Sequence, residues 1–138
     1  MAHLTLEYSA NLRSDGDFAG LCRTLAGVLL AQRDGTAAVF PPGGIRVRAI
    51  PCDDYCIADG RIDAGFVHAT LKMGAGRTPA VRDAACNAVF EAMKQHFARQ
   101  FASMGLALSL EVNEFSEAGT LKHNNLHRLL AAGGAVVK

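Results

Sequence analysis

The strongest candidate binding site in the sequence is the segment 74–79, which reads Gly-Ala-Gly-Arg-Thr-Pro. Thr78 is a good helix N-cap and Pro79 suits the first helical position, so a helix is expected to begin here. Free N–H groups at a helix start, small residues and the guanidinium of Arg77 together suit an anion. Alternatively, the glycines serve only the turn and Arg77 is a solvated residue. No Gly-Lys-Ser/Thr follows, so the segment is not a P-loop.

Two arginines form a second candidate. Arg46 and Arg48 are two residues apart on an expected strand, so their side chains share one face and could hold a dicarboxylate. They could equally be edge charges, or partners of Glu7 and Glu111. The sequence pattern alone leaves both readings open.

Histidines and cysteines offer less specific signals. His68 lies within an expected strand, where it is either a base or a hydrogen-bonded structural residue. His123 and His127 have an i, i+4 spacing that can bind zinc, but with no third ligand in the pattern we expect a solvated face and no metal site. Cys52 and Cys56 are four residues apart, which is a possible metal spacing, but no second cysteine or histidine pair completes a site. No C-x-x-C pair occurs, and we expect all four cysteines, which include Cys22 and Cys86, to be reduced thiols.

The terminal α-amine is the remaining candidate. Residues 2–9 alternate between apolar and polar side chains, which predicts a strand from the start of the chain. Such a strand would hold the amine against the folded body. With a reference pKa of ~7.7–8.0, the amine could serve as base or acid near neutrality. It belongs to Met1 or, if the methionine is removed, to Ala2.

The hydrophobic pattern predicts the scaffold that would position these groups. Alternation predicts strands at 2–9, 45–49, 66–73 and 106–112. Helical spacing predicts a helix at 15–32 with Ser14 as N-cap, a second from Pro79 to Phe101, and a short C-terminal helix at 121–131.

A strand–helix–strand unit therefore occurs twice, at about 2–56 and 65–115, within one domain of residues 1–138. Because helical crossovers return the next strand parallel, we expect an α/β (two-layer α+β) fold with a four-stranded mixed sheet and two helices on one face. The other sheet face would be polar, and either faces water or meets another subunit; it carries Thr5, Glu7, Arg46, Arg48, His68, Thr70, Ser109 and Glu111.

Composition narrows the class of protein. The 138 residues are 50% hydrophobic and 20% charged with a net charge of +1, which indicates a globular chain. The charge argues against nucleic-acid or acidic-membrane partners. The start lacks the pattern of a signal peptide, and no apolar run reaches the ~20 residues of a membrane span, so we expect a cytoplasmic protein.

Several strings together resemble the 5-carboxymethyl-2-hydroxymuconate isomerases, a branch of the tautomerase superfamily. They are HLTLEYSAN at 3–11, FP at 40–41, GIR at 44–46, ADG at 58–60, FVHATLKMGAGR at 66–77, LSLE at 108–111 and KHNNLH at 122–127. The resemblance implies a cytoplasmic homotrimer without a cofactor that acts in the catabolism of aromatic compounds. The implied substrate is an unsaturated 2-hydroxy polycarboxylate left by ring cleavage.

The resemblance also implies roles for individual residues. In the family an N-terminal proline amine shuttles the proton, and arginines hold the carboxylates and stabilise enolate charge. Those arginines fall on Arg46 and Arg77. The proline position is Ala2 here, because the chain begins Met-Ala-His where the family has Met-Pro-His.

Ala2 leaves three functions open. A primary amine can still act as a base, although it lacks the rigid proline ring. The leading prediction is an isomerase of the 5-carboxymethyl-2-hydroxymuconate type. The alternatives are a catalytically impaired protein that binds small carboxylates, and a different chemistry on the same scaffold, such as hydration or decarboxylation of an unsaturated acid.

Overall fold

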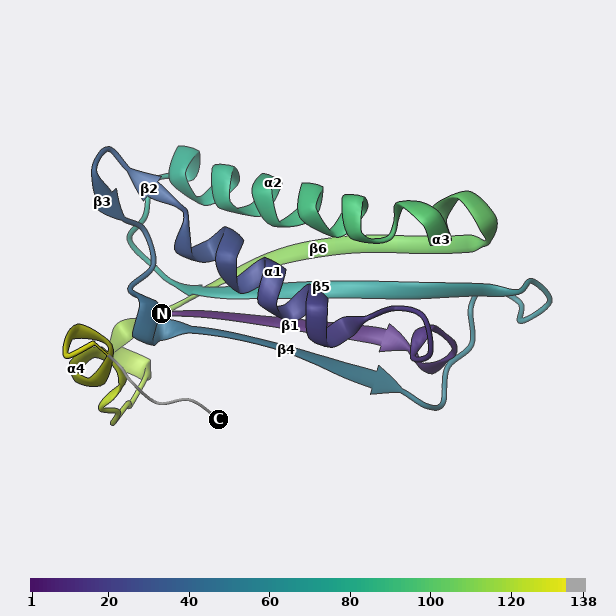
Figure 1. Ribbon diagram of the computed structural model, residues 1–138, viewed down its shortest axis with the longest axis horizontal. Helices are drawn as coiled ribbons and strands as arrows, with labels where there is room; N and C mark the ends of the chain where they lie inside the picture. The colour runs from purple at the N-terminus through teal and green to yellow at the C-terminus, as the bar shows by residue number, and fades with distance from the viewer. Residues whose placement is uncertain (134–138) are drawn as a thin grey trace.

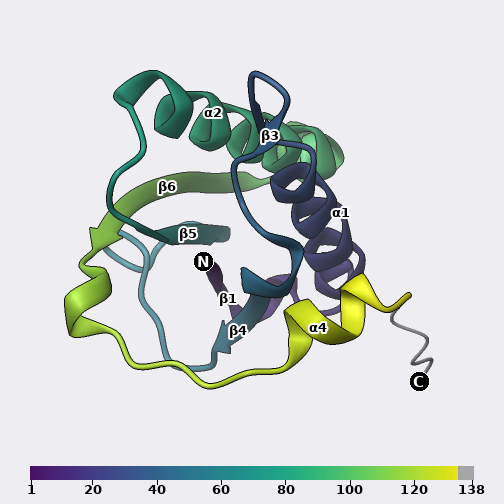
Figure 2. The same cartoon turned by 90° about the vertical axis from the view of Figure 1, so that its left-hand side faces the viewer.

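The computed structural model describes residues 1–133 and shows a four-stranded sheet with two helices on one face (Figures 1 and 2). The strands lie in the order β4-β1-β5-β6. β1 is parallel to β4 and antiparallel to β5, and β5 is parallel to β6. The expected mixed sheet is therefore confirmed, with strands β1 (Ala2–Ser9), β4 (Ile45–Cys52), β5 (Ala64–Gly74) and β6 (Gly105–Phe115).

The helices α1 (Phe18–Leu30) and α2 (Pro79–His96) cover the apolar face of this sheet. Side chains at helical spacing on both helices are fully buried against alternate side chains of β1 and β5; they are Leu21, Leu25, Leu29, Ala85, Val89, Met93, Leu4, Leu6, Val67, Ala69 and Leu71. Burial of this apolar surface is the main stabilising contribution to the fold. Both predicted helices are present, and α2 begins at Pro79 as predicted.

The start of α1 differs from the prediction. Ser14 was expected to cap the helix, but Asp17 does so, with its Oδ1 accepting a hydrogen bond from the Gly20 N–H at 3.1 Å. The residues before it form a 3₁₀ turn, Ala10–Leu12, which delays the helix by several residues. A short ribbon of β2 (Arg33–Asp34) and β3 (Ala37–Ala38) then follows α1.

The end of α2 differs as well. The helix ends at His96, with Phe97 as its C-cap, and a separate short helix, α3 (Ala98–Ser103), follows. Phe97 is fully buried, whereas Phe101 is 64% exposed. The prediction of one helix from Pro79 to Phe101 was therefore wrong at its end, because the break at Phe97 changes the phase of the side chains that follow.

The chain beyond β6 passes the end of the sheet on the side away from the helices (Figure 2). The predicted helix 121–131 was too long, since α4 covers only Leu126–Ala131. Its start follows Asn124, whose side-chain oxygen accepts a hydrogen bond from the Leu126 N–H at 3.1 Å. α4 packs on the 3₁₀ turn Pro42–Gly44, and a turn at Glu117–Gly119 connects it to β6. No helix of residues 1–133 is long and apolar enough to cross a membrane.

Candidate active site

The N-terminus lies at the end of the sheet that the C-terminal segment passes, as Figure 2 shows. β1 begins at Ala2, as predicted, and the Ala2 side chain is fully buried in the core. The carbonyl of Met1 accepts a hydrogen bond from the Gly74 N–H at 3.4 Å. A Cβ at Gly44 would lie 3.1 Å from Met1 Cα, so glycine permits this close approach. The start of the chain is thus held between β4 and β5.

The surroundings of the terminal amine favour its neutral form. Partial burial is the main cause that lowers the pKa of the Met1 amine. The positive charges of Arg77, Lys122 and Arg46 lower this pKa further, whereas the carboxylate of Glu117 opposes them. A neutral amine can accept a proton, so the position suits a base near neutral pH.

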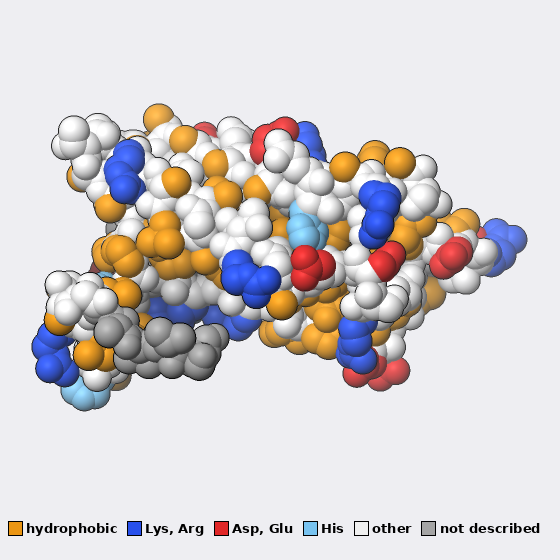
Figure 3. Space-filling view, in the orientation of Figure 1, with side chains coloured by type: hydrophobic (Ala, Val, Ile, Leu, Met, Phe, Trp, Pro, Cys, Tyr) orange, Lys and Arg blue, Asp and Glu red, His pale blue; other side chains and the backbone are white. Residues whose placement is uncertain are grey.

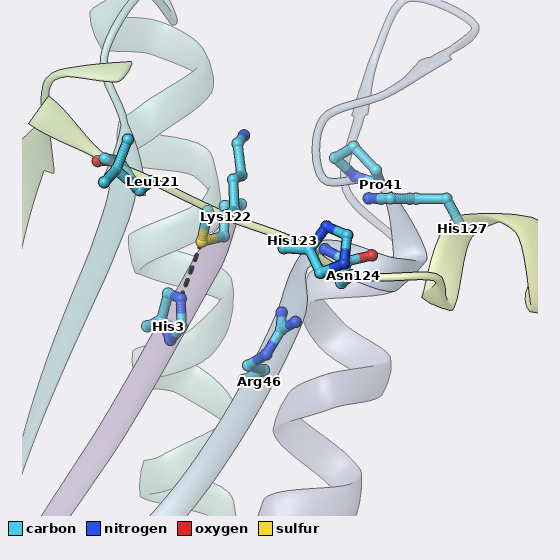
Figure 4. A pocket seen from close by; sticks show the side chains of 11 residues that line it. His3, Pro41, Arg46, Leu121, Lys122, His123, Asn124 and His127 are labelled. Carbon is cyan, nitrogen blue, oxygen red and sulfur yellow. Dashed lines mark hydrogen bonds between the residues drawn. The ribbon is translucent and has the colours of Figure 1, made fainter. Parts of the chain in front are cut away.

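A cavity of about 330 Å³ adjoins the amine, between the sheet end and the C-terminal segment (Figure 4). The residues that line it include three histidines, an arginine and a lysine, but no aspartate or glutamate; they are Met1, His3, Pro41, Gly44, Arg46, Thr120, Leu121, Lys122, His123, Asn124 and His127. Figure 3 shows Lys and Arg side chains in the recess between α4 and β4. The cavity therefore suits an anionic ligand.

Arg46 stands on the sheet wall of this cavity. Its guanidinium points toward His123 on the opposite wall (Figure 4), and its Nη1 donates to the Gly43 carbonyl at 3.3 Å. That single bond is long, so the remaining N–H groups of the half-buried guanidinium can reach a carboxylate. Of the two arginines on this strand, Arg46 is the one that lines the cavity.

Arg77 lies near the amine but is not among the residues that line the cavity. Its guanidinium donates to the carbonyls of Gly74 at 2.8 Å and Val39 at 2.9 Å. It also lies over the Phe40 ring, with Cζ 4.8 Å from the ring centroid. Thr78 and Pro79 begin α2 as predicted. Arg77 thus connects the end of β5 to the loop before β4, with two of its five N–H groups used.

His3 is a site residue that the sequence analysis missed. Its Nε2 lies 2.9 Å from Met1 Sδ, and its Nδ1 lies 3.4 Å from Arg48 Nη1. Burial lowers the pKa of His3, and the charges of Arg48 and Arg46 lower it further. The signal was present in the alternation, which puts His3 and Arg46 on one face, and the register pairs them directly.

Lys122 and the two C-terminal histidines were also not assigned to a site with Arg46. Lys122 Nζ forms an ion pair with Glu117 Oε2 at 3.1 Å and points away from Arg46 (Figure 4). His123 precedes α4, so the i, i+4 pair does not lie on one helix. No group of three metal-binding side chains occurs in residues 1–133. Local spacing could not reveal that this segment returns to the N-terminus.

His68 lies away from the cavity and is bonded within the sheet. Its Nδ1 lies 2.7 Å from Ser109 Oγ, and its Nε2 lies 2.8 Å from Glu111 Oε1. The hydrogen bonds to His68 and to Asn113 lower the pKa of Glu111. These contacts favour the structural interpretation of His68 over a role as a base.

Comparisons with known proteins agree with this geometry. The family model for 5-carboxymethyl-2-hydroxymuconate isomerase matches residues 2–130. A 5-carboxymethyl-2-hydroxymuconate Delta-isomerase from Escherichia coli is 40% identical over 129 residues, which cover 94% of this chain and 98% of that protein.

Solved structures extend the similarity to the fold. The crystal structure of a 5-carboxymethyl-2-hydroxymuconate isomerase from Deinococcus radiodurans R1 is 45% identical, with a TM-score of 0.85 over 94% of this chain and 93% of that one. A fused 4-OT wild-type symmetric trimer is 17% identical, with a TM-score of 0.60 over 88% and 93% of the two chains. The second similarity shows a common fold only.

Proposed function

The chain belongs to the 5-carboxymethyl-2-hydroxymuconate isomerase family, and we propose from this membership that it isomerises 5-carboxymethyl-2-hydroxymuconate. The relative from Escherichia coli is named for this activity and aligns over nearly its whole length. The enzyme would act in the breakdown of aromatic compounds. The observation that carries the proposal is that the chain begins at a cavity lined by cationic and not by acidic side chains, where burial lowers the pKa of the Met1 amine.

The reaction in this proposal moves one proton and two double bonds. Removal of Met1, which lines the cavity, would give the terminal amine to Ala2, the next residue along β1. The neutral amine takes the proton of the 2-hydroxyl group, the C2–O bond becomes a carbonyl, and the C2–C3 and C4–C5 double bonds are replaced by one double bond between C3 and C4, which leaves an electron pair for a new bond at C5. The ammonium then gives the proton to C5. No electrons are lost or gained, so the chemistry calls for no redox cofactor.

Two arginines support this proton transfer in the proposal. Arg46 would bind a carboxylate of the substrate from the sheet wall. Arg77, which lies close enough to lower the pKa of the amine, would bind a second carboxylate or the developing enolate oxygen with its remaining N–H groups. Its bonds to Gly74 and Val39 fix its position before the substrate arrives.

We further propose a homotrimer in the cytoplasm. A polar sheet face without a covering layer is suited to contact with other copies of the chain, and a structural neighbour of the same fold is a symmetric trimer. The four cysteines form no disulfide, as is usual for cytoplasmic proteins.

An ultraviolet assay with 5-carboxymethyl-2-hydroxymuconate tests the proposed activity, using wild type, Ala2→Pro and Ala2→Gly. We expect wild type to turn over the substrate, and Ala2→Pro to raise kcat because the ring fixes the amine. Ala2→Gly keeps a primary amine but loses rigidity, so we expect a lower kcat than wild type. Absence of turnover in both wild type and Ala2→Pro would contradict the proposal and favour a carboxylate-binding protein.

A further inference from the structure

A second cavity lies on the other side of the first residues. It measures about 230 Å³ and is lined by Met1, His3, Lys72, Phe115 and Thr120. Met1, His3 and Thr120 also line the larger cavity beside Arg46. The contact between His3 Nε2 and Met1 Sδ, at 2.9 Å and drawn dashed in Figure 4, therefore joins two residues that line both cavities.

The sheet register puts a cationic side chain on each side of this contact. His3 pairs with Arg46 on β4 and with Lys72 on β5. Side chains directly opposite on neighbouring strands point to the same face of a sheet. Arg46, His3 and Lys72 therefore form one row across three strands, with the histidine in the middle. The charge of Lys72 is close enough to contribute to the lowered pKa of His3.

Lys72 has no competing carboxylate on this row. Neither cavity is lined by an aspartate or a glutamate. The ion pairs among residues 1–133 do not include Lys72, whereas Lys122 is bound by Glu117. Lys72 is exposed in the single chain and lies near the end of β5, where it lines the smaller cavity, so its ammonium group can reach a ligand there.

We propose that removal of Met1 joins the two cavities into one groove, and that Lys72 binds the carboxymethyl arm of the substrate there. This inference rests on the proposed function, because it takes the substrate from it. That substrate carries three carboxylates, two at the ends of the muconate chain and one on the arm. Arg46 and Arg77 are assigned to the muconate chain of the substrate, which leaves Lys72 as the cation for the carboxymethyl arm. Lys72 then determines specificity for a tricarboxylate over a dicarboxylate.

The groove is tested by binding of unreactive analogues. The probes are 2-(carboxymethyl)adipate, a saturated skeleton with all three carboxylates, and adipate, which lacks the arm. The chain is released from a fusion by cleavage so that it begins at Met1 or at Ala2, and calorimetry gives each affinity. We expect the chain that begins at Ala2 to bind the tricarboxylate about tenfold more tightly than the chain that begins at Met1. Equal affinities would overturn the joining of the cavities.

Lys72→Gln, in the chain that begins at Ala2, tests the role of the lysine. Loss of one charge-assisted contact weakens binding by about tenfold, so we expect that loss for 2-(carboxymethyl)adipate and unchanged binding of adipate. The control is Lys94→Gln, which removes a lysine paired with Glu91 on α2. Unchanged tricarboxylate affinity, or an equal loss for both probes, would overturn the role of Lys72.

These measurements are independent of turnover. The probes lack the hydroxyl group and the double bonds, so binding is measured whether or not the enzyme isomerises anything. Isomerase activity together with unchanged binding in Lys72→Gln would overturn this inference and leave the proposed function intact. The expected binding without any activity would uphold the groove and overturn the proposed function. Circular dichroism of Lys72→Gln checks that the exposed substitution leaves the fold unchanged.

Discussion

The two candidate arginines differ in how their guanidinium groups are held. Arg46 has one long bond to a carbonyl, whereas Arg77 has two short bonds and an aromatic contact. Arg46 is therefore placed mainly for a ligand, and Arg77 also joins two parts of the backbone. Substitution of each arginine can therefore separate the contribution to ligand binding from the contribution to holding the backbone in place.

We predict that Arg46→Ala and Arg77→Ala both weaken binding of 2-(carboxymethyl)adipate, with different effects on stability. Arg77→Ala should also lower the free energy of unfolding by about 1–2 kcal/mol, because it leaves two backbone carbonyls without their charged donor. Arg46→Ala should change that free energy by less than about 0.5 kcal/mol. Calorimetry and urea unfolding measure both quantities. Unchanged affinity in Arg77→Ala would refute its role in binding.

The terminal amine predicts a pH dependence of the rate. Burial first, and then the charge of Arg77, lowers the pKa of the Met1 amine, and the Ala2 amine would replace it next to the same side chains after Met1 is removed. We therefore expect the neutral form of the catalytic amine at lower pH than for a free amine. Because the neutral form is the base, kcat/KM should rise with pH and then level off. The midpoint of this rise should lie below the ordinary amine pKa of about 8. The same sign holds for stability: the buried cation is disfavoured, so stability falls as pH falls through this range. A rate midpoint above that ordinary value would contradict the assignment.

At the scale of elements, the C-terminal segment closes the cavity only because it approaches the turn before β4 closely. A Cβ at Gly43 would lie 2.8 Å from His127 Nδ1 and 3.0 Å from its backbone nitrogen. The second contact involves backbone, so a side-chain rotation cannot relieve it. Gly43 therefore sets the position of α4 against the sheet.

We predict that Gly43→Ala raises KM several-fold with little change in kcat, because it displaces one wall of the cavity and leaves the amine in place. The control is Gly27→Ala within α1, where a Cβ meets nothing within 4 Å. That substitution should raise stability by about 0.5–1 kcal/mol and leave KM unchanged. Steady-state kinetics with both variants gives the KM and kcat values that test this prediction. An unchanged KM in Gly43→Ala would show that the position of α4 has no effect on binding.

The elements also show which parts of the fold the sequence could predict. β1 and β5 alternate between buried and less buried residues over most of their length, so the local pattern identified both. The break at Phe97 depends on the packing of that buried side chain. The cap at Asp17 depends on the preceding turn, for which the sequence has no strong local pattern. The site was predicted in part, because Arg46 and the amine lie on strands with clear register. Lys122 and His123 reach it through a long-range return of the chain, which spacing cannot reveal.

For the whole molecule, the uncovered sheet face is the feature that most concerns assembly. Thr5 and Thr70 pair across β1 and β5 at its centre, on the same face as the bonded His68 and Glu111. Small polar side chains permit the close approach of another copy of the chain. In a single chain this face is in contact with solvent. The proposed trimer would bury this face.

We predict that Thr5→Arg dissociates the trimer, because it puts a large charged group on each copy at the centre of the contact, where desolvation and like charge both oppose association. Thr24→Arg is the matched control, since it adds the same charge to an exposed position of α1 on the opposite layer. Sedimentation velocity should give three times the chain mass for wild type and the control, and the mass of one chain for Thr5→Arg. If Thr5→Arg remains a trimer, this face is not the interface; if the control dissociates too, the added charge alone is responsible.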